Sequence, residues 1–362
     1  MRVNYFLSVI LLFASVQLAN NPNIRQFRRM QKVPMRQEIR IPGILGYQTL
    51  KCDFHMHTVF SDGIVWPTYR VEEAWQEGLD AIAITDHIEN QPSKKYITGD
   101  HNVPHELATD IARQRNILLI HGGEITRKMP PGHLNALFLN DTNPLDVPLV
   151  VDALQAAKKQ GAFIFWNHPG WKAQQPDTCR WWPMHQDLFE KGLINGIEVF
   201  NESEYYPIVL DWCLSRNLSV IGNSDIHGIS SQMYDLVNGH RPMTLVFAKG
   251  RNIESIREAM FNNRTVAYFD NKLAGKEDFL KALFLASVTV KTIGTSESNN
   301  RELFEISNMS TIPFEIETQK GEWFTIPSDA SVIMPLVQGE LKRITVLNLY
   351  TGSHSKLKVD FF

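Results

Sequence analysis

The chain has 362 residues, of which 43% are hydrophobic and 21% charged, and its formal net charge is −3 at neutral pH. This length and composition allow a full buried core, arranged as one large domain or as one large and one small domain. The near-neutral charge argues against nucleic acid as the main partner. Three widely spaced cysteines, Cys52, Cys179 and Cys213, indicate neither a disulfide framework nor a Cys-only zinc motif.

The N-terminus combines Arg2 with an apolar run from Phe6 to Leu18, which has the length of a signal-peptide core and is short for a membrane span. We therefore predict that residues 1–20 are a signal peptide, that the protein is exported to the periplasm or secreted, and that no stable membrane span remains after cleavage. Residues 21–42 lack periodicity and are interpreted as a basic linker. The basic residues here are Arg25, Arg28, Arg29, Lys32, Arg36 and Arg40. Their charge bias leaves open an uncleaved anchor, and a buried helix is a further alternative.

Residues 43–275 alternate short apolar runs with amphipathic segments, a pattern typical of parallel βα units. The predicted strands are Leu50–His55, Ala81–Thr85, Leu118–Gly122, Leu134–Leu139, Ala162–Trp166, Gly196–Phe200, Ser219–Gly222 and Thr244–Phe247. The predicted helices are Val71–Glu77, Glu106–Arg115, Val147–Gln160, Ser203–Arg216 and Asn252–Asn262. This number of strands favours a closed barrel over an open sheet.

Over residues 279–362 the alternation of apolar runs and amphipathic segments gives way to short β-like runs separated by turn-rich stretches. This pattern predicts a small all-β sandwich domain. Its predicted strands are Ala282–Lys291, Glu302–Ile306, Pro313–Glu317, Ser331–Pro335, Arg343–Leu349 and Lys356–Phe361. This domain carries no metal or nucleophile pattern, so an interaction or barrel-bracing role is expected.

The first barrel strand carries the sequence Cys-Asp-Phe-His-Met-His, followed by Asp62 and Gly63. Side chains alternate along a strand, so His55 and His57 project to the same face, and Asp62 follows in a turn. Two imidazoles and a nearby carboxylate are a possible start of a metal site.

Further histidines and acids follow the other predicted strands. They lie in Thr85-Asp86-His87, Gly122-Gly123-Glu124, Gly132-His133-Leu134, Asn167-His168-Pro169 and Asp225-Ile226-His227. In a parallel barrel the C-terminal strand ends converge on one mouth, where catalytic groups collect. So many ionisable groups around one mouth would be costly to desolvate without metal, and mixed imidazole and carboxylate ligands suit Zn²⁺, Mn²⁺ or Fe²⁺.

Taken in this order, the motifs between Leu50 and Asp270 resemble those of the PHP (polymerase and histidinol phosphatase) family. The resemblance implies a distorted (β/α)7 TIM-like barrel that holds two to three divalent metal ions. It also implies the ligands of each ion. The first ion would be bound by His55, His57, Glu124 and Asp225. The second would share Glu124 and add His133 and His168. The third would be bound by Asp62, His87 and His227.

We therefore expect an exported metal-dependent phosphoesterase that acts on a small phosphorylated substrate. Glu124 could span two ions, whose bridging hydroxide would attack phosphorus, and we assign catalytic roles to Glu124, Asp225 and His227. Two alternatives stay open: an amidohydrolase-like metal hydrolase of a non-phosphate bond, and a non-catalytic protein that binds metal or a phosphorylated ligand. The oligomeric state is left open.

Several polar residues near these motifs are candidates for substrate binding. They are Arg127, Lys128, Lys172, Arg180 and Asn201. A cation here could meet a phosphate, although a solvated loop position explains each of them as well. The indole-rich stretch contains Trp166, Trp171, Trp181 and Trp182. These rings could form a roof over the pocket or pack in the core.

Overall fold

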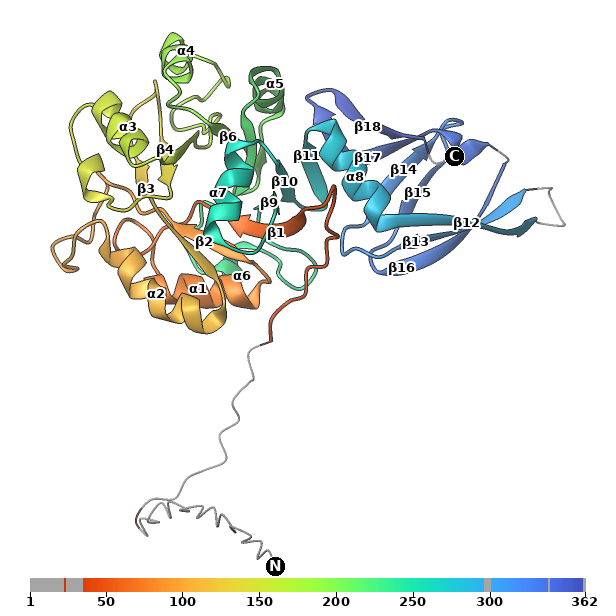
Figure 1. The fold of residues 1–362 in the computed structure, drawn as a ribbon, viewed down its shortest axis with the longest axis horizontal. Helices are drawn as coiled ribbons and strands as arrows, with labels where there is room; N and C mark the ends of the chain where they lie inside the picture. Colours follow the sequence, from red (N-terminus) through yellow and green to blue (C-terminus); the bar gives the residue numbers. More distant parts are fainter. Residues whose placement is uncertain (1–22, 24–34, 296–300, 338, 361–362) are drawn as a thin grey trace, which may run out of the picture. The chain divides into compact units, whose positions relative to one another are not determined.

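The computed structural model describes residues 23, 35–295, 301–337 and 339–360. Its larger part is an α/β barrel (Figure 1), which confirms the predicted fold class. The barrel strands are β1 (Gln48–Asp53), β2 (Ala81–Ile84), β3 (Leu118–Ile125), β4 (Leu134–Leu137), β5 (Phe163–Trp166), β6 (Gly196–Asn201), β8 (Ser219–Asn223) and β9 (Met243–Ala248). The helices are α1 (Pro67–Gln76), α2 (Val103–Arg115), α3 (Val150–Lys159), α4 (Pro183–Glu190), α5 (Pro207–Arg216), α6 (Ser230–Met233) and α7 (Ile253–Phe261), with the 3₁₀ helix η1 at Asn143–Leu145.

The strand order around the barrel is β9-β1-β2-β3-β4-β5-β6-β8. Strands β1, β2 and β3 run parallel, as do β5, β6 and β8. Strand β4 is antiparallel to β3 and β5, and β9 is antiparallel to β1, so the expectation of parallel units throughout is wrong for these two strands. The reason for β4 is the eight-residue connection 126–133, which is too short for the crossover that a parallel pair needs.

Side-chain hydrogen bonds join β8 to β9 and complete the ring. Gly222 N donates to Thr244 Oγ1 at 3.0 Å, and that hydroxyl donates back to Gly222 O at 2.8 Å. A Cβ atom on Gly222 would lie 2.9 Å from Met243 O, so this close approach of the two strands requires glycine.

Helix α1 shows how the sequence sets the packing of a barrel helix. It starts at Pro67, which suits the first turn because proline lacks the N–H that would be unpaired there. Its buried face includes Val71 and Ala74, spaced three residues apart. Gly78 follows the helix with φ +83° in the left-handed region, and a Cβ atom on it would lie 2.8 Å from Gln37 O.

The segment just before the barrel packs against this helix. Gln37 N donates to Gln76 O at 2.7 Å, and the Arg36 guanidinium donates to Trp75 O and Leu79 O at 2.8 and 2.9 Å. The end of the predicted basic linker is therefore docked on the barrel. The predicted signal peptide and most of residues 21–34 lie outside the described residues. In the described part of the chain, no helix has both the length and the apolar character needed to cross a membrane.

After β9 the chain leaves the barrel through β10 (Thr265–Phe269) and β11 (Lys272–Gly275), and helix α8 (Glu277–Ser287) follows. The strand predicted from Ala282 is wrong at its start, because β12 begins only at Val288. Buried Leu280, Leu283, Phe284 and Ser287 recur at helical spacing, and this period of three to four decides the structure.

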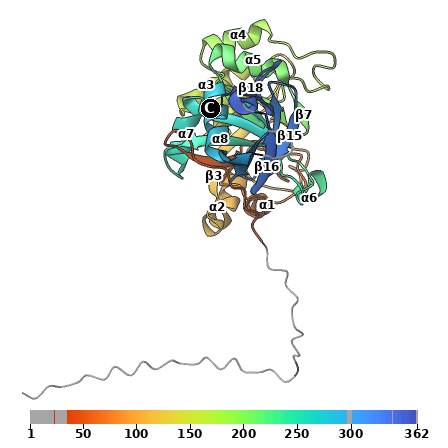
Figure 2. The same ribbon diagram turned by 90° about the vertical axis from the view of Figure 1, so that its right-hand side faces the viewer.

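The C-terminal region contains two antiparallel sheets beside the barrel (Figures 1 and 2). One sheet contains β12 (Val288–Thr295), β13 (Glu302–Asn308) and β16 (Ala330–Leu336). The other contains β14 (Phe314–Thr318), β15 (Trp323–Ile326), β17 (Ile344–Gly352) and β18 (Ser355–Val359), with η2 at Glu340–Lys342. Strand β17 pairs parallel with β11, so this second sheet continues from the barrel. The predicted domain division at residues 275–279 stays a prediction.

Candidate metal centre

The end of β1 and the turn after it position three of the predicted ligands. His57 N donates to Ile226 O at 3.0 Å, which anchors this segment to the one that carries Asp225 and His227. The turn then folds back so tightly that a Cβ atom on Gly63 would lie 2.6 Å from the His57 carbonyl carbon. Glycine at this position therefore lets Asp62 return toward the histidines.

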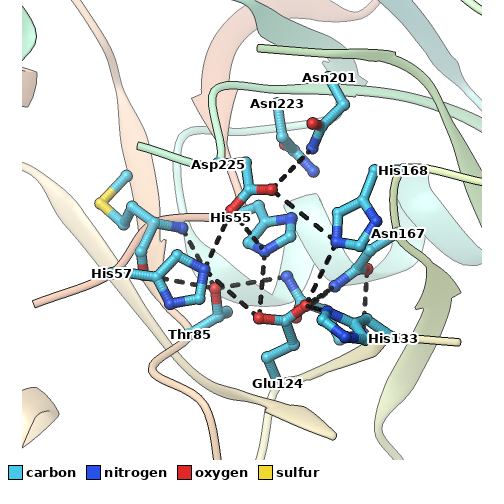
Figure 3. A network of polar contacts seen from close by, with 12 residues as sticks. His55, His57, Thr85, Glu124, His133, Asn167, His168, Asn201, Asn223 and Asp225 are labelled. Carbon is cyan, nitrogen blue, oxygen red and sulfur yellow. Dashed lines mark hydrogen bonds and ion pairs between the residues drawn. The ribbon is translucent and has the colours of Figure 1, made fainter. Parts of the chain in front are cut away.

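A buried group at the barrel mouth consists of His55, His57, Glu124 and Asp225 (Figure 3). The Nε2 atoms of His55 and His57 lie 3.1 and 3.0 Å from Asp225 Oδ1, and 3.5 and 3.3 Å from Glu124 Oε2. The four residues predicted for the first ion thus converge, although they come from separate strand ends.

Glu124 Oε1 faces the residues predicted for the second ion. His133 Nδ1 lies 3.0 Å from this oxygen and His168 Nε2 lies 3.6 Å from it. The amide of Asn167 also donates to it at 2.8 Å. The two oxygens of Glu124 therefore face different imidazoles, as Figure 3 shows.

The residues predicted for the third ion lie around the Asp62 carboxylate. Its Oδ1 lies 3.2 Å from His227 Nε2 and 3.5 Å from His87 Nε2. His57 Nδ1 is also 3.9 Å away, and His87 Nδ1 lies 2.7 Å from Glu124 Oε2. His57 and His87 therefore each contact both Asp62 and Glu124, which the sequence interpretation assigned to different ions.

The donor atoms in these groups fit divalent metal ions. His55 Nε2, Glu124 Oε2 and Asp62 Oδ1 are buried, with polar atoms 3.1, 2.7 and 3.2 Å away, yet no contact of these three atoms within the described structure has the geometry of a hydrogen bond. Buried polar atoms are nearly always hydrogen-bonded, so three atoms without a hydrogen bond in one cluster of imidazoles and carboxylates require an explanation. Coordination to divalent metal ions would explain them, and nitrogen with carboxylate oxygen is a donor set typical of Zn²⁺, Mn²⁺ or Fe²⁺.

The electrostatics of the centre keep its two central carboxylates and the His57 ring in the form that binds metal. Burial alone would raise the pKa of the Glu124 carboxyl, but the imidazoles of His87 and His55 hold it well below its usual range. His55 and His57 lower the pKa of Asp225 against the same effect of burial. For His57, burial and then the charge of His87 lower the pKa to about 3. Both carboxylates are thus ionised at neutral pH, and the His57 ring is neutral.

Further buried acids surround the predicted ligands. Asp86 accepts hydrogen bonds from Thr58 N and Ser61 Oγ at 2.6 and 2.5 Å, and Ser61 Oγ lies 3.2 Å from His57 Nδ1. The sequence interpretation missed Glu198, whose Oε1 lies 2.8 Å from His55 Nδ1. The sequence feature that could have indicated Glu198 is a single carboxylate within the apolar run of β6. A charge buried in such a run requires polar partners.

A cavity of about 320 Å³ opens above the centre and is lined by ligands of all three groups. Of the predicted substrate contacts, Lys172 and Asn201 line it. Arg127 does not, because its guanidinium pairs with Glu89 and donates to Val147 O. Lys128 and Arg180 are exposed outside the lining, and the Arg180 guanidinium lies over the Trp182 ring.

The indole-rich stretch divides between the cavity and the core. Trp171 is partly exposed, lines the cavity and lies 5.4 Å from the His168 ring. Trp166 is fully buried and stacks on His185 with ring centroids 3.7 Å apart. The cavity-roof interpretation thus describes Trp171, and the core interpretation describes Trp166.

A structural comparison connects this centre to known proteins, whereas no family model and no curated protein matches the chain. A Bacteroides vulgatus two-domain protein containing a predicted PHP-like metal-dependent phosphoesterase is 43% identical over 91% of this chain and 99% of its own, with a TM-score of 0.86. Two other matches are weaker, with TM-scores below 0.5. One is a proposed metal-dependent phosphoesterase from Bifidobacterium adolescentis (19% identity, 58% of this chain and 96% of its own, TM-score 0.41), and the other an amidohydrolase from Chromobacterium violaceum (15%, 50% and 89%, TM-score 0.39). The fold, the set of candidate ligands and the 43% identity to the Bacteroides vulgatus protein show that the chain belongs to the PHP-type family.

Proposed function

We propose that the protein hydrolyses a phosphate ester of a small molecule at a centre of two to three divalent metal ions. The observation that carries the proposal is the convergence of nine imidazole and carboxylate side chains at the barrel mouth, with three buried donor atoms that make no hydrogen bond. The name of the Bacteroides vulgatus relative supports the choice of a phosphate ester over an amide.

Each oxygen of Glu124 would serve a different ion. Its Oε2 faces His55 and His57, and its Oε1 faces His133 and His168. Metal ions held there would supply Lewis-acid activation of water and neutralise charge that develops on the phosphate oxygens. The fixed, ionised carboxylate needs no rearrangement when substrate enters.

The chain's own residues would hold the substrate in the cavity. Lys172 is the only lysine or arginine among the described residues that line it, so we assign Lys172 to a phosphate oxygen. Asn201 donates to Asp225 Oδ2 at 3.4 Å and so restrains this ligand. Trp171 provides an apolar face beside His133 and His168 for the rest of the substrate.

The test combines metal analysis with substrate screening. Protein purified without chelator is assayed for bound metal and for hydrolysis of p-nitrophenyl phosphate, bis(p-nitrophenyl) phosphate and a non-phosphate ester. Mutation of a residue that only hydrogen-bonds a metal ligand already lowers metal affinity or activity by about 10- to 100-fold. His57→Ala and Asp225→Ala remove the ligands themselves, so they should lower activity by at least about 100-fold. His101→Ala, at a histidine outside the cavity lining, is the control. Bound metal without turnover of any phosphate ester, with wild type matching the variants, would contradict the proposal.

We also propose that the protein is exported. Support comes from Arg2 and the apolar run Phe6–Leu18, which have the order and length of a signal peptide. Expression of the full-length chain, followed by cell fractionation and mass measurement of the intact product, tests this. A mature N-terminus near residue 20 in the periplasm or medium is the expected result, and an unprocessed chain in the cytoplasm would contradict it.

A further inference from the structure

Glu198 lies in the middle of β6, a strand whose six residues are all buried. Its neighbours Ile197 and Val199 pack in the apolar core, so the carboxylate points to the opposite side, toward the metal centre. A fully buried carboxylate is costly unless its lone pairs are satisfied. Its partners therefore show what it does.

Four polar groups meet this carboxylate: one from the segment after β1, one from the segment after β5, one from the end of β6 and one from the end of β8. Oε1 lies 2.8 Å from His55 Nδ1 and accepts from Asn223 Nδ2 at 2.9 Å. Oε2 accepts from His168 N at 2.7 Å and from Asn201 Nδ2 at 2.8 Å. The backbone N–H of His168 and the two Asn side-chain NH₂ groups can only donate hydrogen bonds, so both oxygens of Glu198 act as acceptors. We infer that Oε1 accepts from His55 Nδ1 in the same way.

We propose that Glu198 is a positioning residue of the metal centre, which fixes the tautomer of His55 and holds His168 and Asn201 in place. A hydrogen on His55 Nδ1 leaves the lone pair on Nε2. That atom is the buried, unpaired nitrogen that lies 3.1 Å from Asp225 Oδ1. A carboxylate behind a ligating histidine orients the ring and raises its basicity.

The contact with the His168 backbone has a second consequence. His168 has φ +28° and Asp225 has φ +49°, in the left-handed region that non-glycine residues rarely adopt. The bond from His168 N to Glu198 compensates for that strain at one ligand. Asn201 extends the restraint to the other, because its amide lies within hydrogen-bonding distance of both Glu198 and Asp225.

The inference rests on the proposed metal-dependent function for its ligand assignment, and its test does not use phosphate hydrolysis. Zn²⁺ affinity is measured by competition with a chelating dye for wild type, Glu198→Gln and Glu204→Gln. Glutamine has one acceptor oxygen, so one of the obligate donors must then face an NH₂ group. We expect Glu198→Gln to bind its tightest Zn²⁺ about 10- to 100-fold more weakly. Glu204→Gln, a control at a cavity residue outside the ligand set, should match wild type.

A second measurement needs no variant. Nitrogen-15 NMR of the zinc-loaded wild type should show hydrogen on His55 Nδ1 and metal on Nε2. The opposite tautomer would overturn the inference, and so would a folded Glu198→Gln whose affinity is within twofold of wild type. Tight zinc binding with the expected tautomer but no phosphate ester turnover would overturn the proposed function and support this inference. A wild type that binds no divalent metal would overturn both.

Discussion

Replacement of Arg241 by methionine should strongly destabilise the protein. The guanidinium is fully buried, with Nε 2.6 Å and Nη2 2.9 Å from the two oxygens of Glu77, and Nη1 3.2 Å from Asp53 Oδ2. Methionine fills a similar length but leaves both buried carboxylates without their cation. Removal of one partner of a buried ion pair costs about 3–5 kcal/mol, and we expect a loss of that size in the free energy of unfolding.

The loss should depend on pH with a defined sign. Burial raises the pKa of Asp53, and the charge of Arg241 opposes that rise, so the variant should raise the pKa further. A carboxyl whose pKa is higher in the folded than in the unfolded chain takes up a proton on folding. Its destabilising effect is full above the folded pKa and disappears as pH falls toward the unfolded value. The difference between wild type and Arg241→Met should therefore shrink between pH 7.5 and pH 5.

Urea unfolding monitored by tryptophan fluorescence measures this difference. The matched control is Arg113→Met, which breaks the exposed pair between Arg113 and Asp110. Exposed pairs contribute about 0–1 kcal/mol, so the control should be close to wild type. A loss below about 1 kcal/mol for Arg241→Met, or a difference that grows at low pH, would refute the reasoning.

Three further changes test other parts of the structure. Gly63→Ala places a Cβ atom against the His57 backbone, so zinc titration should show a lost or weakened site at Asp62; unchanged stoichiometry and affinity would contradict this. Trp171→Ala should raise KM several-fold with an unchanged melting temperature, and the reverse result would place Trp171 in the core. Burial lowers the pKa of His185 to about 4, below its unfolded value near 6.5, so the unfolded chain takes up the proton first and stability falls as pH drops through this range. Between neutral pH and pH 4.5, the free energy of unfolding measured with urea should fall by about 3 kcal/mol less for His185→Phe than for wild type. An equal fall in both proteins would show that the acid sensitivity has another origin.

Most of the predicted metal ligands could be placed together from the sequence, because strand geometry decides their direction. Residues two apart in an extended segment, such as His55 and His57 just after β1, point the same way. Groups at the ends of successive strands, such as His87 after β2 and Glu124 near the end of β3, meet where the strand ends converge. Neither argument needs the packing of the rest of the chain.

The sequence could not settle features that depend on three-dimensional contacts. Alternation of strands and helices does not state strand direction, and only the short connection before Leu134 indicated that β4 turns back. Arg127 lies in the stretch between two ligands, yet its pairing with Glu89 became visible only in the fold. Glu198 lay in an apolar run, and its four partners come from segments up to 143 residues away.

The most direct test of the metal centre is X-ray diffraction from crystals of the purified wild-type protein, with data collected on both sides of the absorption edge of the metal that it contains. We predict anomalous peaks within coordination distance of His55 Nε2, Glu124 Oε2 and Asp62 Oδ1, the three buried donors without hydrogen bonds. Metal bound elsewhere, or ordered donors at these positions without a peak in crystals of metal-saturated protein, would contradict the account.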